Sequence, residues 1–127
     1  MAVFEQFEIG ALYIFEKEID IGAINWSIHN KFEGVALKHL ITAKDTEGEF
    51  SYHLVRVAPQ KKIGLHVHET QLETHEVIAG AGACITGGRR LAYTAGVIAV
   101  LPAGVEHEVL AGADGLYLFA KFFPALF

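Results

Sequence analysis

The stretch 59-PQKKIGLHVHETQLETHEVIAG-80 decides the fold, and it supplies three candidate metal ligands. Side chains alternate faces along an extended strand, so His66 and His68 point the same way and their imidazoles can converge on one ion. Glu73 follows five residues after His68, which leaves room for a turn that returns a carboxylate to the same face. Imidazole and carboxylate together suit one divalent transition metal such as Fe, Mn, Ni, Co or Zn.

A second stretch, 96-GVIAVLPAGVEH-107, offers a fourth ligand. Pro102 and Gly104 predict a tight turn between two strands, and His107 follows that turn at the start of the next strand. Val105, His107 and Val109 alternate with Glu106 and Glu108, which independently predicts that His107 points inward.

The two stretches together resemble the motifs of the cupin superfamily. The first family motif, G(x)5HxH(x)3-4E(x)6G, is matched by His66, His68, Glu73 and Gly80. The second, G(x)5PxG(x)2H(x)3N, is matched by Gly96, Pro102, Gly104 and His107. Two positions depart from the pattern: Gln60 stands where the first glycine is expected, and Ala111 where the closing asparagine is expected. Neither is a ligand position, so the departures concern turn geometry more than chemistry.

The resemblance implies an all-β fold, the cupin-type double-stranded β-helix (jelly-roll barrel), with the ion inside. It also implies that His66, His68, Glu73 and His107 bind the metal and that the protein is a homodimer. The strand pattern agrees, because many short apolar segments are separated by Gly, Asn, Asp or Pro. We expect one domain over 1–127, with an N-terminal arm and irregular segment at 1–33 and the barrel core at 34–123.

Composition narrows the classes of partner. The chain has 127 residues, 52% of them hydrophobic, and a formal charge of -5, without a large basic cluster. These values argue against nucleic-acid binding and favour a small-molecule ligand or substrate, with apolar surface left over for a dimer. The sequence contains neither a signal-peptide pattern nor an apolar run of about 20 residues, so we expect a cytoplasmic protein without a membrane span. Cys84 lies in an apolar strand, where we expect it to be packing.

Several expectations concern individual segments. We expect about ten strands, no helix, and a polar hairpin loop at 43–50. The glycines at 80–82 predict a turn between strands 76–79 and 83–86. The segment 97–101 should be buried on both faces. Strand 116–123 is apolar on both faces, so it should be covered inside by the barrel and outside by another subunit or the N-terminal arm.

Three further residues are candidates for a role at the site. His75 shares a face with Glu73 if a strand has begun there, which makes it a candidate catalytic acid or base, a partner of the metal ligand, or a packed histidine. His53 and Arg56 are candidates for substrate binding. They fall on opposite faces of strand 50–58, so at most one of them points into the barrel.

Two functions from different classes follow. The first is a metal-dependent enzyme of the dioxygenase, isomerase or lyase class acting on a small metabolite, because three histidines and a glutamate leave coordination positions free. The alternative is a non-catalytic module in which the metal positions a small molecule for binding or sensing. The fold alone does not choose between them.

Overall fold

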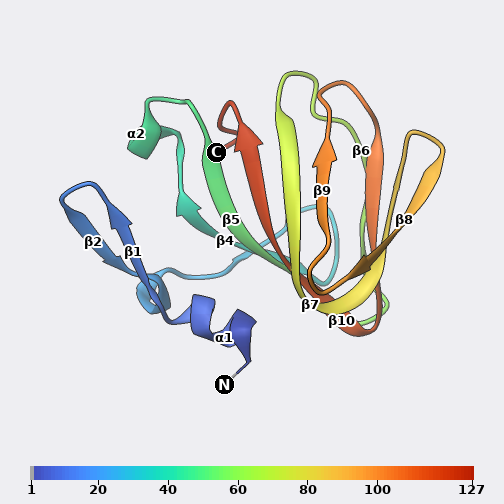
Figure 1. The fold of residues 1–127 in the computed structure, drawn as a ribbon, viewed down its shortest axis with the longest axis horizontal. Coiled ribbons are helices and arrows are strands. Elements are labelled where there is room, and N and C mark those ends of the chain that lie inside the picture. Colours follow the sequence, from blue (N-terminus) through green and yellow to red (C-terminus); the bar gives the residue numbers. More distant parts are fainter. Residues whose placement is uncertain (1) are drawn as a thin grey trace.

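The computed structural model describes residues 2–127. Strands account for most of these residues, and the elements follow one another along the chain (Figure 1). They are α1 (Val3–Glu8), β1 (Ala11–Ile14), β2 (Lys17–Asp20), the 3-10 turn η1 (Ile21–Ala23), β3 (Ser27–Ile28), β4 (Val35–Ile41), α2 (Ala43–Thr46), β5 (Ser51–Val57), β6 (Lys62–His66), β7 (Leu72–Thr86), β8 (Arg89–Thr94), β9 (Ile98–Leu101) and β10 (His107–Phe123). The architecture confirms the prediction of an all-β fold of the cupin type. The expectation of no helix was wrong, because the short helices α1 and α2 form at Val3–Glu8 and Ala43–Thr46.

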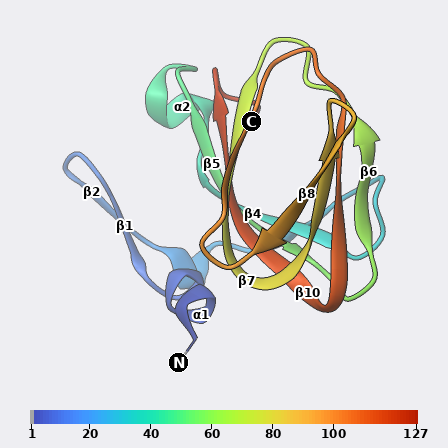
Figure 2. The same ribbon diagram turned by 45° about the vertical axis from the view of Figure 1, so that its right-hand side comes forward.

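Two long strands, β7 and β10, run antiparallel through the middle of the larger sheet, whose order is β3-β4-β5-β10-β7-β8. The second half of β10 pairs with β5, and its first half pairs with β6. The first half of β7 pairs with β9, and its second half pairs with β8. The sheet therefore rolls over on itself into two facing layers with a shared interior (Figures 1 and 2).

Glycines allow this rolling. Gly80 and Gly115 have φ of 78° and 79°, and a Cβ at Gly80 would collide with the carbonyl oxygen of Gly115. A Cβ at Gly82 would likewise collide with the carbonyl oxygen of Leu110 on the neighbouring strand. Such glycines mark a sharp bend in paired strands. The prediction of a turn at 80–82 that ends one strand was therefore wrong, because β7 bends there and continues to Thr86.

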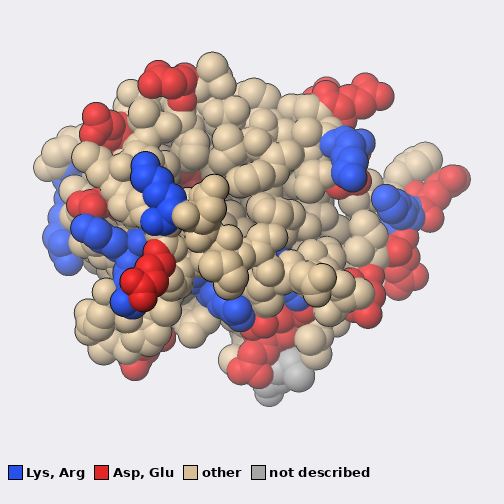
Figure 3. Space-filling view, turned by 180° about the vertical axis from the view of Figure 1, so that it is seen from behind, with Lys and Arg blue, Asp and Glu red and all other residues tan. Residues whose placement is uncertain are grey.

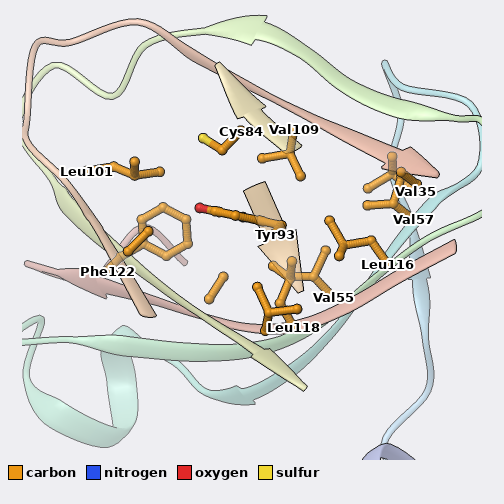
Figure 4. Packing of buried hydrophobic residues seen from close by; sticks show 14 residues of the cluster. Val35, Val55, Val57, Cys84, Tyr93, Leu101, Val109, Leu116, Leu118 and Phe122 are labelled. Atoms are coloured by element: carbon orange, nitrogen blue, oxygen red, sulfur yellow. The ribbon is translucent and has the colours of Figure 1, made fainter. Parts of the chain in front are cut away.

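The interior is filled by one apolar cluster contributed by both layers. Tyr93 lies in the middle of it, fully buried, with Val109, Leu116 and Leu118 of β10 around it (Figure 4). Cys84 is also fully buried there, which confirms that it packs in the core.

The N-terminal segment covers the outer face of one layer. Phe4 of α1 packs against Tyr117 with the rings tilted and their centroids 4.9 Å apart, and Phe7 contacts Phe119 edge-on at 4.8 Å. Lys38 of β4 is buried beneath this segment and donates hydrogen bonds of 3.0 Å to the carbonyl oxygens of Glu8 and Ile21. The outer side of β10 is thus covered by the chain's own N-terminal segment, one of the two covers expected for it.

Two local expectations were wrong. The segment 43–50 is not simply a hairpin loop, because α2 forms there behind a capping box between Thr42 and Asp45. The segment 97–101 is buried on one face only, since Ile98 and Val100 of β9 are 71% and 59% exposed. With Phe15, 96% exposed at the tip of the β1–β2 hairpin, these side chains leave apolar surface, and the homodimer stays a prediction.

Seen from behind, basic and acidic side chains lie together toward the two sides of the molecule, and a broad area between them carries few charges (Figure 3). Among residues 2–127, no helix is long and apolar enough to cross a membrane.

Candidate metal centre

The structure brings all four predicted ligands together inside one end of the barrel. His66 ends β6, His68 follows it, Glu73 is the second residue of β7 and His107 begins β10. One ligand atom of each lies within 4.8 Å of the others. Strand pairing sets this arrangement, because β6 and β10 place His66 directly opposite His107.

Backbone carbonyls fix which nitrogen of two histidines is available. Nδ1 of His66 donates to the carbonyl oxygen of Gly64 at 2.7 Å, and Nδ1 of His107 donates to that of Val105 at 3.4 Å. An imidazole whose single proton lies on Nδ1 has a free lone pair on Nε2, so these contacts leave Nε2 of both rings available to a metal. Metal-binding histidines are oriented in this way, with the second nitrogen engaged elsewhere.

Glu73 presents one satisfied oxygen and one unsatisfied oxygen. Its Oε2 accepts a hydrogen bond of 2.7 Å from Nε2 of His75. Its Oε1 lies 3.0 Å from Nε2 of His107 and 3.5 Å from Nε2 of His68. Despite this approach, Oε1 of Glu73 and Nε2 of His107 are buried without a hydrogen-bond partner. A cation in the cluster would give both atoms a partner, so the residues fit a metal ion.

The charges of the cluster suit a cation as well. Burial by itself raises the pKa of the Glu73 carboxyl, but attraction to His75 and His107 outweighs it and holds that pKa well below its usual value. Burial lowers the pKa of His66 and of His68. Near neutral pH the centre therefore combines a carboxylate with neutral imidazoles at these two positions, the protonation state that metal binding requires.

His75 lies behind Glu73. It is 1% exposed, its Nε2 donates to Glu73, and its Nδ1 accepts a hydrogen bond of 2.8 Å from the hydroxyl of Tyr93. Burial beside Cys84 raises the pKa of Tyr93 well above its ordinary value, so the hydroxyl keeps its proton. Both nitrogens of His75 are thus engaged in a chain that orients the Glu73 carboxylate. Tyr93 was not identified from the sequence as part of this hydrogen-bond network. The only sequence signal was that Tyr93 and Leu91, two residues apart in strand 89–94, share one face.

A cavity of about 260 Å³ opens beside the cluster and is lined by His66, His68, Glu73 and His75. Most of the remaining wall is apolar and comes from β4, β5, β10 and the C-terminal segment. The exposed Lys31 and Phe127 also line it, which places the mouth of the cavity near these residues. A small molecule in this cavity would contact the cluster directly.

The other two candidates, His53 and Arg56, do not line this cavity. Nδ1 of His53 lies 2.8 Å from Nδ1 of His39, and its Nε2 lies 2.9 Å from Oγ of Ser51. The guanidinium of Arg56 lies on the opposite side of β5, 4.3 Å from the ring centroid of Trp26. Both residues are therefore engaged in contacts outside the cavity.

Comparisons with known proteins agree with this geometry. A family model described as "Cupin domain" matches residues 53–117. A search of curated proteins finds no match. Among solved structures, a predicted oxalate decarboxylase from Thermotoga maritima superimposes with a TM-score of 0.75 at 19% identity, covering 81% of this chain and 95% of that one.

Two further solved structures show the same fold. The polyketide cyclase RemF from Streptomyces resistomycificus has a TM-score of 0.74 at 18% identity and covers 89% of this chain and 87% of its own. Ectoine synthase from P. lautus has a TM-score of 0.67 at 22% identity, with 74% and 67% covered. At these identities the likeness concerns the fold.

Proposed function

This chain belongs to the cupin family, and from that premise we propose that it is a metal-dependent enzyme acting on a small molecule. One divalent transition metal, drawn from Fe, Mn, Ni, Co and Zn, is held by His66, His68, Glu73 and His107.

One observation carries this proposal: Oε1 of Glu73 and Nε2 of His107 lie 3.0 Å apart, buried, and without hydrogen-bond partners. A buried polar atom that lacks a partner costs on the order of 1–3 kcal/mol, and here two such atoms face each other. A cation bound by both atoms would remove that cost.

The residues in and around the cluster have different roles in the proposed activity. An ion held by these four residues would supply Lewis-acid chemistry beside the cavity. Glu73 contributes the negative charge, and Tyr93 and His75 hold its carboxylate in place through hydrogen bonds of 2.8 and 2.7 Å. The apolar wall excludes water from the molecule that enters. Because both nitrogens of His75 are engaged, we assign it a positioning role and not that of a catalytic acid or base.

The names of the structurally similar proteins favour catalysis over binding alone. A decarboxylase, a polyketide cyclase and ectoine synthase all share this architecture, and each name denotes a reaction on a small molecule. In this chain a cavity reaches the cluster, so a small molecule can bind next to the proposed metal site.

Metal content tests the first part of the proposal. Protein purified without an affinity tag should contain about one first-row transition metal per chain by elemental analysis, and His107→Ala should lose most of it. His39→Ala is the matched control, because His39 lies outside the cluster, and it should retain the metal. Unchanged metal content in His107→Ala would refute the assignment of that ligand.

Turnover tests the second part. Oxygen uptake or product formation across a panel of catechols, thiols and keto acids supports the enzyme. Thermal stabilisation by a panel member, without turnover of any of them, supports instead a non-catalytic binding or sensing module. The metal-depleted protein is the control in both assays.

A further inference from the structure

The polar groups of the cavity lie at two separate places. The first is the cluster of His66, His68 and Glu73, and the second is the segment between β3 and β4, which contributes His29 and Lys31. Among the lining residues that the structure describes, Lys31 is the only lysine and there is no arginine. The rest of the lining is mostly apolar and includes Val55, Leu118 and Phe122.

His29 is held as a hydrogen-bond donor. Its Nδ1 accepts hydrogen bonds from the backbone N–H of Lys31 at 3.0 Å and of Phe32 at 3.2 Å. Burial and the nearby Lys31 lower the pKa of His29, which favours the neutral ring. With Nδ1 occupied as an acceptor, the one proton of that ring lies on Nε2, which is available to donate. The ammonium of Lys31 lies 5.4 Å from the centroid of Phe32, so a cation is at the same place.

Phe32 separates this pair from the metal cluster. Its ring centroid lies 4.8 Å from that of His29 and 6.1 Å from that of His66. A ligand that spans both polar places would therefore lie close to this aromatic ring. Its middle section meets carbon atoms and finds few partners for hydroxyl groups.

We propose that the ligand is an elongated molecule with a flat, apolar body that carries metal-binding oxygens at one end and a carboxylate or other anionic acceptor at the other. This inference rests on the proposed metal-dependent function. The first end binds at the cluster, the body packs on Phe32, and the anionic end is bound by Lys31 and His29. The same wall disfavours sugar phosphates, because their hydroxyl groups would be buried against hydrocarbon without partners and their dianion would meet a single lysine.

Binding to zinc-loaded protein tests the proposal, since Zn²⁺ does no redox chemistry and leaves the probes intact. The probes are catechol, 4-propylcatechol, caffeate and glucose 6-phosphate, with dissociation constants measured by calorimetry. We expect 4-propylcatechol to bind roughly tenfold more tightly than catechol, because its propyl group is buried in the apolar section. Caffeate, with a carboxylate on an arm of similar length, should bind several-fold more tightly again. Glucose 6-phosphate should bind most weakly.

Variants separate the anionic end from the rest. Lys31→Met removes the cation, and His29→Asn keeps an acceptor for the backbone while removing the Nε2 donor. Each should reduce caffeate affinity to about that of 4-propylcatechol and leave 4-propylcatechol unchanged. Lys62→Met, at an exposed lysine of β6 that does not line the cavity, is the matched control and should change neither affinity.

The outcomes distinguish this inference from the function on which it rests. If none of Fe²⁺, Mn²⁺, Ni²⁺, Co²⁺ and Zn²⁺ binds, both are overturned. If Zn²⁺ binds but 4-propylcatechol is no better than catechol, or glucose 6-phosphate binds most tightly, only the ligand class is wrong. Equal caffeate affinity in the wild type, Lys31→Met and His29→Asn overturns the role of the second polar place.

Discussion

Two groups of histidines occupy the barrel, and they differ in how their nitrogens are satisfied. In the pair formed by His39 and His53, the Nδ1 atoms lie 2.8 Å apart and Nε2 of His53 lies 2.9 Å from Oγ of Ser51. In the cluster around Glu73, Nε2 of His107 and Oε1 of Glu73 have no hydrogen-bond partner.

The difference shows what marks a binding site in this protein. Buried histidines that hydrogen-bond one another complete their own polar contacts and need nothing else. The cluster around Glu73 keeps two buried atoms without hydrogen-bond partners, which a bound cation would satisfy. The distinction rests on unsatisfied atoms and not on the number of histidines, and each of the following experiments challenges it.

The largest effect is expected from Glu73→Gln. The substitution keeps the size of the side chain but removes the negative charge that faces the imidazoles, so metal affinity should fall by more than the roughly 10–100-fold that loss of an outer partner costs. Competition with a chromogenic chelator measures it. Glu76→Gln, at the glutamate of β7 that pairs with Lys121, is the control and should retain full affinity. Equal affinities in the two variants would remove Glu73 from the centre.

A smaller effect is expected behind the cluster. His75→Phe removes the donor to Glu73, and metal affinity should fall by about 10–100-fold while the fold persists. Tyr93→Phe removes only the hydroxyl that orients His75 and should cost less. The same chelator competition applies, with circular dichroism to confirm folding. A folded His75→Phe protein with wild-type metal affinity would show that His75 only packs.

A substitution at the His39–His53 pair should change the stability of the fold and leave metal binding unchanged. Ser51→Ala leaves Nε2 of the buried His53 without its partner, so the free energy of unfolding should fall by about 1–3 kcal/mol in urea titrations. Metal content should stay at the wild-type value. Loss of metal in this variant would contradict the separation of the two groups.

The smallest effect is a dependence of stability on pH. Burial, with His39 nearby, lowers the pKa of His53 from 6.5 to about 3. Between these two values the unfolded chain binds a proton that the folded chain does not, so the free energy of unfolding falls as the pH decreases through this range and is insensitive to this group above it.

Metal-free protein isolates the contribution of His53. Between about pH 7.5 and about pH 6, the free energy of unfolding measured by urea titration should fall by roughly 1 kcal/mol more in the wild type than in His53→Leu. Identical differences in the two proteins would mean that His53 is protonated in the folded state.

The sequence was most informative about features that depend only on residues close together in the chain. The alternation of His66 and His68, and that of Val105, His107 and Val109, follow from strand geometry, so inward placement was predictable from a few residues. The pairing of His66 with His107 depends on the register between β6 and β10 across a long loop, which only the family resemblance indicated.

Other features depend on contacts that no local pattern encodes. Gly80 and Gly82 resemble turn residues, but their role is set by the neighbouring strand that approaches them, so the continuity of β7 was missed. Tyr93 bonds to a histidine 18 residues earlier, a pairing that alternation does not reveal. The helix α2 did have a local signal, because Thr42 and Asp45 have the spacing of a capping box.

Strand β10 begins at His107, within the cluster, and its residue Phe122 lies on the wall of the same cavity. Both features therefore belong to a strand that is paired along its length, and they cannot shift without disturbing three neighbouring strands, β5, β6 and β7. By contrast, His29, Lys31 and Phe32 lie in a connecting segment outside the ladders. Selectivity for different ligands can thus change through that segment, in evolution or by engineering, while the chemistry of the centre is inherited unchanged.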